Sequence, residues 1–351
     1  MQVTKIKVNL IADIGIKKID SILPLLSGFE DINIKYLDTG SINSQNIIDA
    51  DILLIRSQTR VNESLLLKSR VAWIGSATAG IDHIDMHYLE KNNITWFNAV
   101  GCNSASVCSY VLSCLYVLSI DENFNKSNTV GIFGYGNIGK KLKTILDNLN
   151  IKNYVCDPYL DNDCLVDKAT VLNSDIISIH TPLTFGGQFP THKLIDSKEL
   201  SQTKSHTIIN TARGGIVCES AILRSGINYI ADVWENEPSP TYEIVKSSFI
   251  ATPHIAGHSH EGKLNGTIAV LRELMQFLRM SSDQIMANLK KINEVACLQE
   301  TEYESIKDFY NQYPVLDESI NFKDKVLSEQ SDFNRLRFQH PIRHDVTNFI
   351  T

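Results

Sequence analysis

Three side chains that can bind anions or exchange protons follow separate apolar runs in the second half of the chain. They are Arg213, which precedes two glycines, Glu237 and His254. Histidine exchanges protons near neutral pH, a carboxylate behind an imidazole fixes its tautomer, and a guanidinium holds a carboxylate through paired hydrogen bonds. Together such groups could take the proton from a hydroxy acid while its carboxylate is held still. Each residue alone is more often a surface charge, a loop residue or a packed side chain.

A glycine-rich segment predicts a binding site for the dinucleotide that would accept the hydride in such an oxidation. Residues 130–142, VGIFGYGNIGKKL, join an apolar run to a helical pattern through Gly134, Gly136 and Gly139. This spacing allows a tight turn, close approach of the backbone to a pyrophosphate, and close packing of the helix on the strand. Asp157 ends the next apolar run, where an acidic residue accepts hydrogen bonds from ribose and repels a 2′-phosphate. An ordinary strand-to-helix turn is the alternative, but the spacing and flanks favour NAD.

The elements around these residues alternate between short strands and helices. Six strands are expected between residues 129 and 252, at 129–133, 153–156, 175–180, 207–211, 228–233 and 248–252. Alternation of this kind is typical of a doubly wound parallel sheet, which binds its ligands beyond the carboxyl ends of the strands. The candidate residues follow these strands, so we expect them to line one cleft.

The first hundred residues have the same α/β alternation without a nucleotide fingerprint. Strands are expected at 5–11, 32–37, 51–55, 71–76 and 94–98, with helices near 19–26, 64–69 and 86–91. A long helix at 104–120 is interpreted as the bridge to the nucleotide-binding part, and a helix at 261–280 as the return. The tail from residue 289 lacks the alternation and reads as a small extra module.

Composition narrows the class of protein. With 351 residues, more than one domain is expected. The net charge of −7 and the absence of a long basic run give little support to nucleic-acid binding. No apolar segment approaches the length of a membrane span, and the N-terminus lacks a signal-peptide core. The seven cysteines form no CxxC pair, which favours buried free thiols in a reducing cytoplasm.

Four motifs together resemble the D-isomer-specific 2-hydroxyacid dehydrogenase family: VGIFGYGNIGKKL, NTARGGIV, DVWENEP and ATPHIAGHSHEGK. The resemblance implies that Arg213, Glu237 and His254 are the catalytic trio and that His254 is the proton shuttle. The loop residues expected to contact NAD are Gly134, Gly136, Asn137, Ile138 and Gly139. The further NAD contacts that the resemblance implies are Asp157, Thr181, Thr211, Ala212, Asp232 and Gly257. No metal is expected.

Residues 56–62, 74–85 and 98–103 are similar to a narrower branch, the erythronate-4-phosphate dehydrogenases of vitamin B6 (pyridoxal 5′-phosphate) biosynthesis. The resemblance implies oxidation of 4-phospho-D-erythronate to 2-oxo-3-hydroxy-4-phosphobutanoate, with substrate contacts from Ser57 and Thr78. Hydrogen bonding within their loops is the alternative role for these two hydroxyls. His258 stands where that branch usually has a tyrosine that contacts substrate, so the charge on this contact would depend on pH.

The resemblance also implies an architecture. It comprises a Rossmann NAD domain at 101–253, a flavodoxin-like substrate domain from 1–100 and 254–288, and an α+β dimerisation module at 289–351. Residues 333–337 and 341–343 resemble the branch's dimerisation domain, so a homodimer is expected. A phosphorylated substrate needs a second cation, for which the candidates are Arg56, Arg60 and Lys263, with Arg335, Arg337 or Arg343 from a partner subunit.

Two alternatives remain open from the sequence. Another 2-hydroxyacid dehydrogenase, such as a 3-phosphoglycerate dehydrogenase, is disfavoured by the tail and by the loop at 76–80. A non-catalytic NAD-sensing protein on the same fold is disfavoured by the intact set of Arg213, Glu237 and His254.

Overall fold

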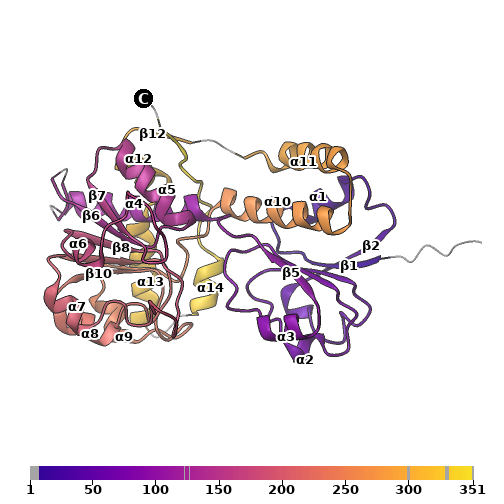
Figure 1. Ribbon diagram of the computed structural model, residues 1–351, viewed down its shortest axis with the longest axis horizontal. Helices are drawn as coiled ribbons and strands as arrows, with labels where there is room; N and C mark the ends of the chain where they lie inside the picture. The colour runs from indigo at the N-terminus through magenta and orange to yellow at the C-terminus, as the bar shows by residue number, and fades with distance from the viewer. Residues whose placement is uncertain (1–7, 122, 126, 299–300, 329–331, 350–351) are drawn as a thin grey trace, which may run out of the picture. The chain divides into compact units, whose positions relative to one another are not determined.

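The chain folds into two compact units, each built around a parallel sheet (Figure 1). The computed structural model describes residues 8–121, 123–125, 127–298, 301–328 and 332–349. The first unit contains Met1–Asn103 and His260–Gln299, and the second contains Ser104–Ser259 and Glu300–Thr351. The α/β class and the two predicted parallel sheets are thereby confirmed.

The first unit has a five-stranded sheet in the order β2-β1-β3-β4-β5. Its strands are β1 (Val8–Asp13), β2 (Ile32–Leu37), β3 (Ile52–Ile55), β4 (Trp73–Ser76) and β5 (Thr95–Asn98). Its α-helices are α1 (Ile19–Ile22), α2 (Glu63–Leu66), α3 (Met86–Lys91), α10 (His260–Phe277) and α11 (Ser282–Ala296). Neighbouring residues of β3 point to opposite faces of the sheet and belong to different hydrophobic clusters. Leu54 packs in one cluster with Leu271 of α10, whereas Leu53 packs in the other with Leu89 of α3. Both faces are therefore covered by helices, which explains the continuous apolar runs.

The second unit has a six-stranded parallel sheet in the order β11-β10-β9-β8-β6-β7. Its strands are β6 (Val130–Phe133), β7 (Asn153–Cys156), β8 (Ile176–Ile179), β9 (Thr207–Asn210), β10 (Asn228–Ala231) and β11 (Ile250–Ala251). The helices between them are α5 (Asn137–Asn148), α6 (Lys168–Leu172), α7 (Ser197–Gln202), α8 (Glu219–Ser225) and α9 (Tyr242–Ser247). Because β6 pairs with both β7 and β8, the strand order reverses at β6, where doubly wound sheets bind their ligands.

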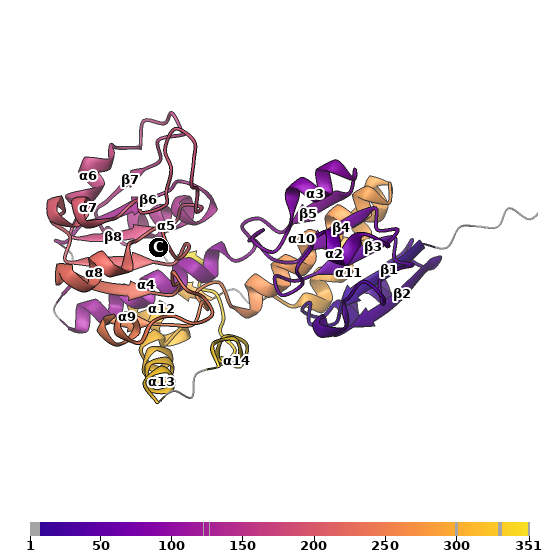
Figure 2. The ribbon, with the colours of Figure 1, turned by 90° about the horizontal axis from the view of Figure 1, so that it is seen from below.

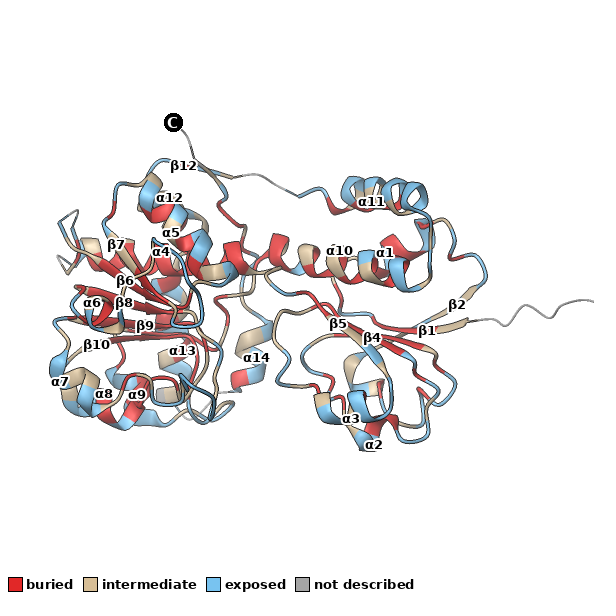
Figure 3. Ribbon diagram, viewed as in Figure 1, coloured by how far each residue is buried: buried red, intermediate tan, exposed pale blue. Residues whose placement is uncertain are grey.

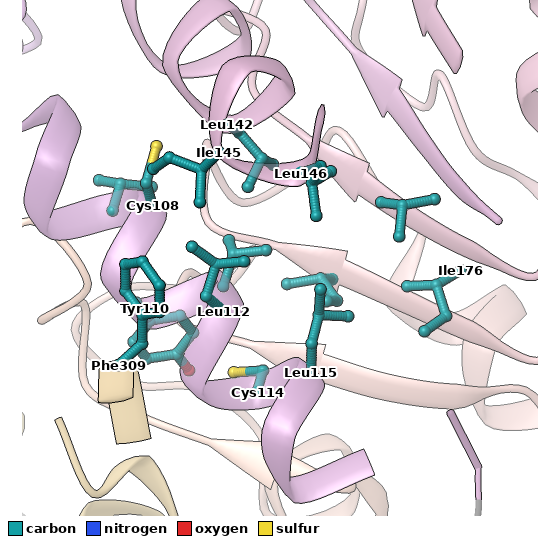
Figure 4. Packing of buried hydrophobic residues seen from close by; sticks show 14 of the residues in the cluster. Cys108, Tyr110, Leu112, Cys114, Leu115, Leu142, Ile145, Leu146, Ile176 and Phe309 are labelled. Carbon is teal, nitrogen blue, oxygen red and sulfur yellow. The ribbon is translucent and has the colours of Figure 1, made fainter. Parts of the chain in front are cut away.

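Helix α4 (Ser104–Ile120) is buried on nearly every side (Figure 3). Figure 4 shows Leu112 and Leu115 of α4 with Leu142 and Leu146 of α5, in the same cluster as the sheet residue Ile176. A helix that is apolar all round belongs inside a core. It is therefore enclosed within the second unit.

The tail of the chain after residue 300 covers a further face of α4. It forms β12 (Glu302–Tyr303), α12 (Ile306–Gln312), α13 (Val315–Leu327), α14 (Phe333–Phe338) and β13 (Asn348–Phe349). Helix α12 lies beside α4 in both views (Figures 1 and 2), and Tyr313 packs edge-on against Tyr110 with ring centroids 5.6 Å apart. Helix α13 packs on β11, where the amide of Ala251 donates to Ser319 Oγ over 2.9 Å. The described residues after 300 thus share the core of the second unit.

The predicted strands differ from the observed strands mainly at their ends. Strands β2 and β7 and helices α3 and α4 have the predicted bounds. The run predicted at 248–252 shortens to β11, and residues 5–7 of the first predicted strand lie outside the described residues. In the part of the chain that the structure describes, no helix is long and apolar enough to cross a membrane. None of the seven cysteines, all of which lie among the described residues, is in a disulfide; Cys108, Cys114, Cys156 and Cys218 are buried.

We expect Gly139→Ala to destabilise the second unit, because its Cβ would lie 2.0 Å from the carbonyl oxygen of Gly134. Overpacking of this kind costs about 1–3 kcal/mol. Gly136→Ala is the matched control, since a Cβ there meets nothing within 4 Å. Urea unfolding of both variants measures the difference, and equal stability of G139A and G136A contradicts the packing argument.

Candidate active site

The loop between β6 and α5 has the shape of a phosphate-binding turn. Gly134 has φ of 96°, a conformation that residues with a Cβ rarely adopt, and the exposed Gly136 leaves the mouth of the loop open. The amide of Tyr135 donates to Asp157 Oδ2 over 2.9 Å, which fixes this carboxylate beside the loop. Amides at the start of α5 and an acidic residue at the end of β7 fit a pyrophosphate and a ribose.

The end of β8 adds a second feature that fits a dinucleotide. The Thr181 hydroxyl is buried and has no hydrogen-bond partner among the described residues. A buried hydroxyl without a partner is unfavourable, so this atom is suited to a ligand. Its neighbour His180 bonds to Ser178 Oγ over 2.9 Å and to Thr211 Oγ1 over 3.3 Å. Burial lowers the pKa of His180 to about 3, which keeps the ring neutral.

Arg213 follows β9 on a turn that the backbone holds tightly. Asn210 accepts from the Ala212 amide over 3.1 Å and donates to the Arg213 carbonyl over 3.0 Å. A Cβ on Gly214 would lie 1.8 Å from the carbonyl oxygen of Trp234, so only glycine permits this approach. The turn that carries Arg213 is thereby fixed against the turn that precedes Glu237.

His254 and Glu237 form a hydrogen-bonded pair. Their atoms Nδ1 and Oε2 are 2.8 Å apart, and because an ionised carboxylate only accepts, His254 Nδ1 donates. The backbone amide of Trp234 donates to Glu237 Oε1 over 3.0 Å. Burial acts to raise the pKa of Glu237, but the hydrogen bond and charge of His254, with the Trp234 amide and the charge of Arg337, act to lower it, so the pKa lies below its usual value. In the neutral ring this tautomer leaves Nε2 as a proton acceptor.

Asp232 holds the loop on which His254 lies. Its carboxylate is 1% exposed and accepts from Thr252 Oγ1 over 2.7 Å and from the amides of Ile255 and Ala256 over 2.7 and 2.9 Å. Burial raises the pKa of Asp232, while His254 and these donors act in the opposite direction. Its two oxygens are thus engaged by the loop, and a direct contact with NAD stays a prediction.

Residues of the tail and of α4 donate hydrogen bonds to backbone carbonyls of the same loop. The Tyr313 hydroxyl donates to the carbonyl of Ile255 over 2.8 Å, and Arg343 Nη2 donates to the same oxygen over 3.4 Å. The Arg343 guanidinium lies 3.7 Å from the centre of the Tyr313 ring. From α4, Ser106 Oγ donates to the Ala256 carbonyl over 2.8 Å. These contacts support His254 in its left-handed conformation, with φ of 56°. No local sequence signal indicated them.

Gly257 and His258, which come next, are half-buried. His258 Nδ1 lies 3.1 Å from His340 Nε2 of the tail. Because His340 Nδ1 lies 2.7 Å from the Pro341 carbonyl, which only accepts, a neutral His340 accepts at Nε2 and His258 donates. The pairing was not expected from the sequence.

Ser57 and Thr78 belong to the first unit. Ser57 is exposed after β3, and Thr78 follows β4. Thr78 Oγ1 lies 2.8 Å from Ser76 Oγ, which lies 3.1 Å from His83 Nε2. Burial lowers the pKa of His83 to about 4, although Asp82 acts to raise it. A neutral His83 therefore orients the hydroxyls of Ser76 and Thr78. The structure describes no cluster of His, Cys, Asp and Glu side chains suited to a metal.

The chain is similar to known proteins. Residues 120–256 match the family described as D-isomer specific 2-hydroxyacid dehydrogenase, NAD binding domain. An erythronate-4-phosphate dehydrogenase of Ruthia magnifica subsp. Calyptogena magnifica is 35% identical over 317 residues, which cover 88% of this chain and 89% of that one. The chain belongs to the erythronate-4-phosphate dehydrogenase family. A relative from Wigglesworthia glossinidia brevipalpis, with the same name, is 42% identical over 70% of this chain and 68% of its own.

A solved structure supports the fold. The NAD⁺-bound 3-phosphoglycerate dehydrogenase of Entamoeba histolytica matches with a TM-score of 0.64 and 24% identity, over 78% of this chain and 96% of that chain. At that identity the likeness concerns the fold alone. With the family match and the features of the glycine loop, it identifies the sheet of the second unit as an NAD-binding domain.

We expect Asp232→Asn to weaken the second unit by about 1–3 kcal/mol, because its amide would present a donor to the backbone amide of Ile255 or Ala256. The exposed Asp163, changed to Asn, is the matched control. Urea unfolding measures the loss. A D232N protein as stable as D163N contradicts the assigned role of this carboxylate.

Glu219 and Glu235 fix the segment before Glu237 through reciprocal bonds. The Glu219 amide donates to Glu235 Oε1 over 3.0 Å, and the Glu235 amide donates to Glu219 Oε1 over 2.9 Å. Glu219 is 5% exposed. Burial, with the charges of Glu235 and Glu237, raises the pKa of Glu219 to about 7 despite the bond from the Glu235 amide.

This raised pKa predicts a pH-dependent stability. The ordinary glutamate pKa of 4.5 applies to the unfolded chain, so the stabilising contribution of Glu219 is complete below pH 4.5 and is lost as pH rises through about 7. Glu219→Gln keeps the acceptor and cannot ionise. We expect E219Q to gain about 2–3 kcal/mol over the parent at pH 8 relative to pH 4.5 in urea unfolding. The exposed Glu243, changed to Gln, should show no such gain; a pH-independent difference for E219Q contradicts the prediction.

Proposed function

We propose that the chain oxidises 4-phospho-D-erythronate to 2-oxo-3-hydroxy-4-phosphobutanoate with NAD, a step of pyridoxal 5′-phosphate biosynthesis. The observation that carries this proposal is the 2.8 Å hydrogen bond between His254 and Glu237 on the NAD-binding unit of a chain of this family. Such a pair provides a proton acceptor of fixed tautomer, which hydroxy-acid oxidation requires.

Each of the three side chains has a defined task. His254 Nε2 takes the proton of the C2 hydroxyl, and Glu237 stabilises the imidazolium that forms. Arg213 holds the substrate carboxylate and stabilises the developing carbonyl oxygen. NAD, when bound, supplies the acceptor for the hydride. The half-buried positions of Arg213 and His254 leave each side chain with access to a ligand.

The cofactor contacts follow the carboxyl edge of the six-stranded sheet. We infer that Gly134, Gly136, Asn137, Ile138 and Gly139 approach the pyrophosphate and that Asp157 accepts from the adenosine ribose. The remaining proposed contacts are Thr181, Thr211, Ala212, Asp232 and Gly257. The buried, unpartnered hydroxyl of Thr181 supports its inclusion. Ser57, Thr78 and His258 are the proposed substrate contacts.

The finer architecture is also a proposal. The strand order β2-β1-β3-β4-β5 is that of flavodoxin-like sheets, which supports the assignment of the first unit, Met1–Asn103 and His260–Gln299, as the substrate domain. We infer that residues 101–253 bind NAD and that part of residues 289–351 mediates a homodimer; the 75% exposure of Ile342 supports an apolar contact there. A cytoplasmic location stays a prediction from the cysteine pattern.

We expect His254→Asn to lower kcat by about 10²–10⁴-fold, because it removes the proton acceptor. Asparagine tolerates the left-handed backbone of this position, so the loop is preserved. NADH formation from 4-phosphoerythronate measures turnover, and NADH fluorescence measures cofactor binding, which should be unchanged.

The purified parent enzyme supplies the direct test of substrate. Turnover of 4-phosphoerythronate in preference to 3-phosphoglycerate supports the proposal, and the reverse preference overturns it. Undiminished turnover by H254N overturns the role of His254 and favours chemistry carried by another residue.

A further inference from the structure

Arg337 of the tail lies among the charged residues of the candidate site. Burial lowers the pKa of Arg337 and the charge of Arg213 acts in the same direction, whereas the charges of Glu237 and Asp232 act to raise it. Its Nε atom is buried and has no hydrogen-bond partner among the residues that the structure describes. A buried guanidinium nitrogen without an acceptor is costly, so the position is built for an acceptor that binds there.

Helix α14 and the residues just after it contact the segment that follows His254. His258 stacks on Phe338 with ring centroids 6.4 Å apart, and its Nδ1 lies 3.1 Å from His340 Nε2. The guanidinium of Arg337 lies 5.8 Å from the centre of the Phe338 ring. The residue is therefore positioned by the same short segment that contacts His258.

Other basic residues have different surroundings. Arg56 is paired with the buried Asp13 over 3.2 Å and also donates to Thr39. Arg343 is 2% exposed and covers Tyr313. Arg335 is exposed and donates to Gln339 over 2.9 Å. Arg60 and Lys263 belong to the first unit and are rivals to be tested.

We propose that Arg337, with His258 beside it, binds the phosphate group of the substrate, and that the tail delivers this cation to the site of its own chain. The inference rests on the proposed function. Arg213 and Arg337 repel each other, and a substrate with a carboxylate at one end and a phosphate at the other relieves this repulsion by placing one anion at each guanidinium. Arg213 would select for the carboxylate of a hydroxy acid, and Arg337 would select for the phosphate at its other end.

Arg337→Ala tests the subsite, with Arg335→Ala on the same helix as the matched control. We expect R337A to raise KM for 4-phosphoerythronate by about 10–100-fold while kcat stays within about threefold, because a charge-assisted bond to the phosphate is lost. The KM for unphosphorylated erythronate and the affinity for NADH should not change. R335A should behave as the parent, and Arg337→Lys should recover part of the affinity because it keeps a point charge.

Several outcomes overturn the inference. An unchanged KM for 4-phosphoerythronate in R337A, with a raised KM in Arg60→Ala or Lys263→Ala, assigns the phosphate to the first unit. An equal loss of kcat for 4-phosphoerythronate and erythronate means that Arg337 acts on the Glu237–His254 pair and does not bind the phosphate. If the parent enzyme does not oxidise 4-phosphoerythronate at all, the proposed function fails and this inference fails with it.

Mixing inactive H254N with R337A separates delivery within one chain from delivery by a partner. If Arg337 serves its own chain, no mixed assembly contains a complete site, and the KM of the mixture stays that of R337A. If a partner supplied Arg337, mixed assemblies would restore the low KM in part of the sites. Such recovery overturns delivery within the chain.

Discussion

The carboxylate of Asp232 lies at the end of β10 and accepts hydrogen bonds from one hydroxyl and two amides of the loop at 252–256. Those bonds decide where His254 lies, and through it where Glu237 can pair. A buried carboxylate is expensive unless its oxygens are satisfied, so any displacement of the loop leaves a poorly satisfied charge in the core. The position of the proposed proton acceptor is therefore tied to the stability of the sheet's edge.

The tail contributes to the same constraint. Tyr313 and Arg343 donate hydrogen bonds to the carbonyl of Ile255, and Asp232 accepts one from the amide of Ile255. The backbone of this residue is therefore fixed at both its donor and its acceptor. Helix α12, which carries the chain to Tyr313, covers the apolar helix α4. The described residues after 300 thus support the candidate site as well as the core, and α14 carries Arg337, for which we propose a role in binding the substrate.

Much of the fold could be predicted because its signals are local. The apolar runs of the two parallel sheets, the helix at 104–120 and the glycine turn at 134–139 each depend on residues adjacent in sequence. Strand ends were less accurate, as for β11, because hydrogen bonding to β10 rather than side-chain type decides where a strand stops. The module expected at 289–351 has no local signal for its packing, and its described residues after 300 share a core with the NAD-binding unit.

The sequence by itself determined the class of chemistry. Gly134, Gly136 and Gly139 act through their own backbone and predict dinucleotide binding, and the order of Arg213, Glu237 and His254 along the strands predicts the residues that would act on a hydroxy acid. Only the tertiary structure decided which contacts place them. The 2.8 Å bond from His254 to Glu237, the bonds of Asp232 to the loop at 252–256 and the contact of His258 with His340 join residues that lie on different elements. The physical reason is that hydrogen bonds and burial depend on distance in space, which sequence separation does not encode.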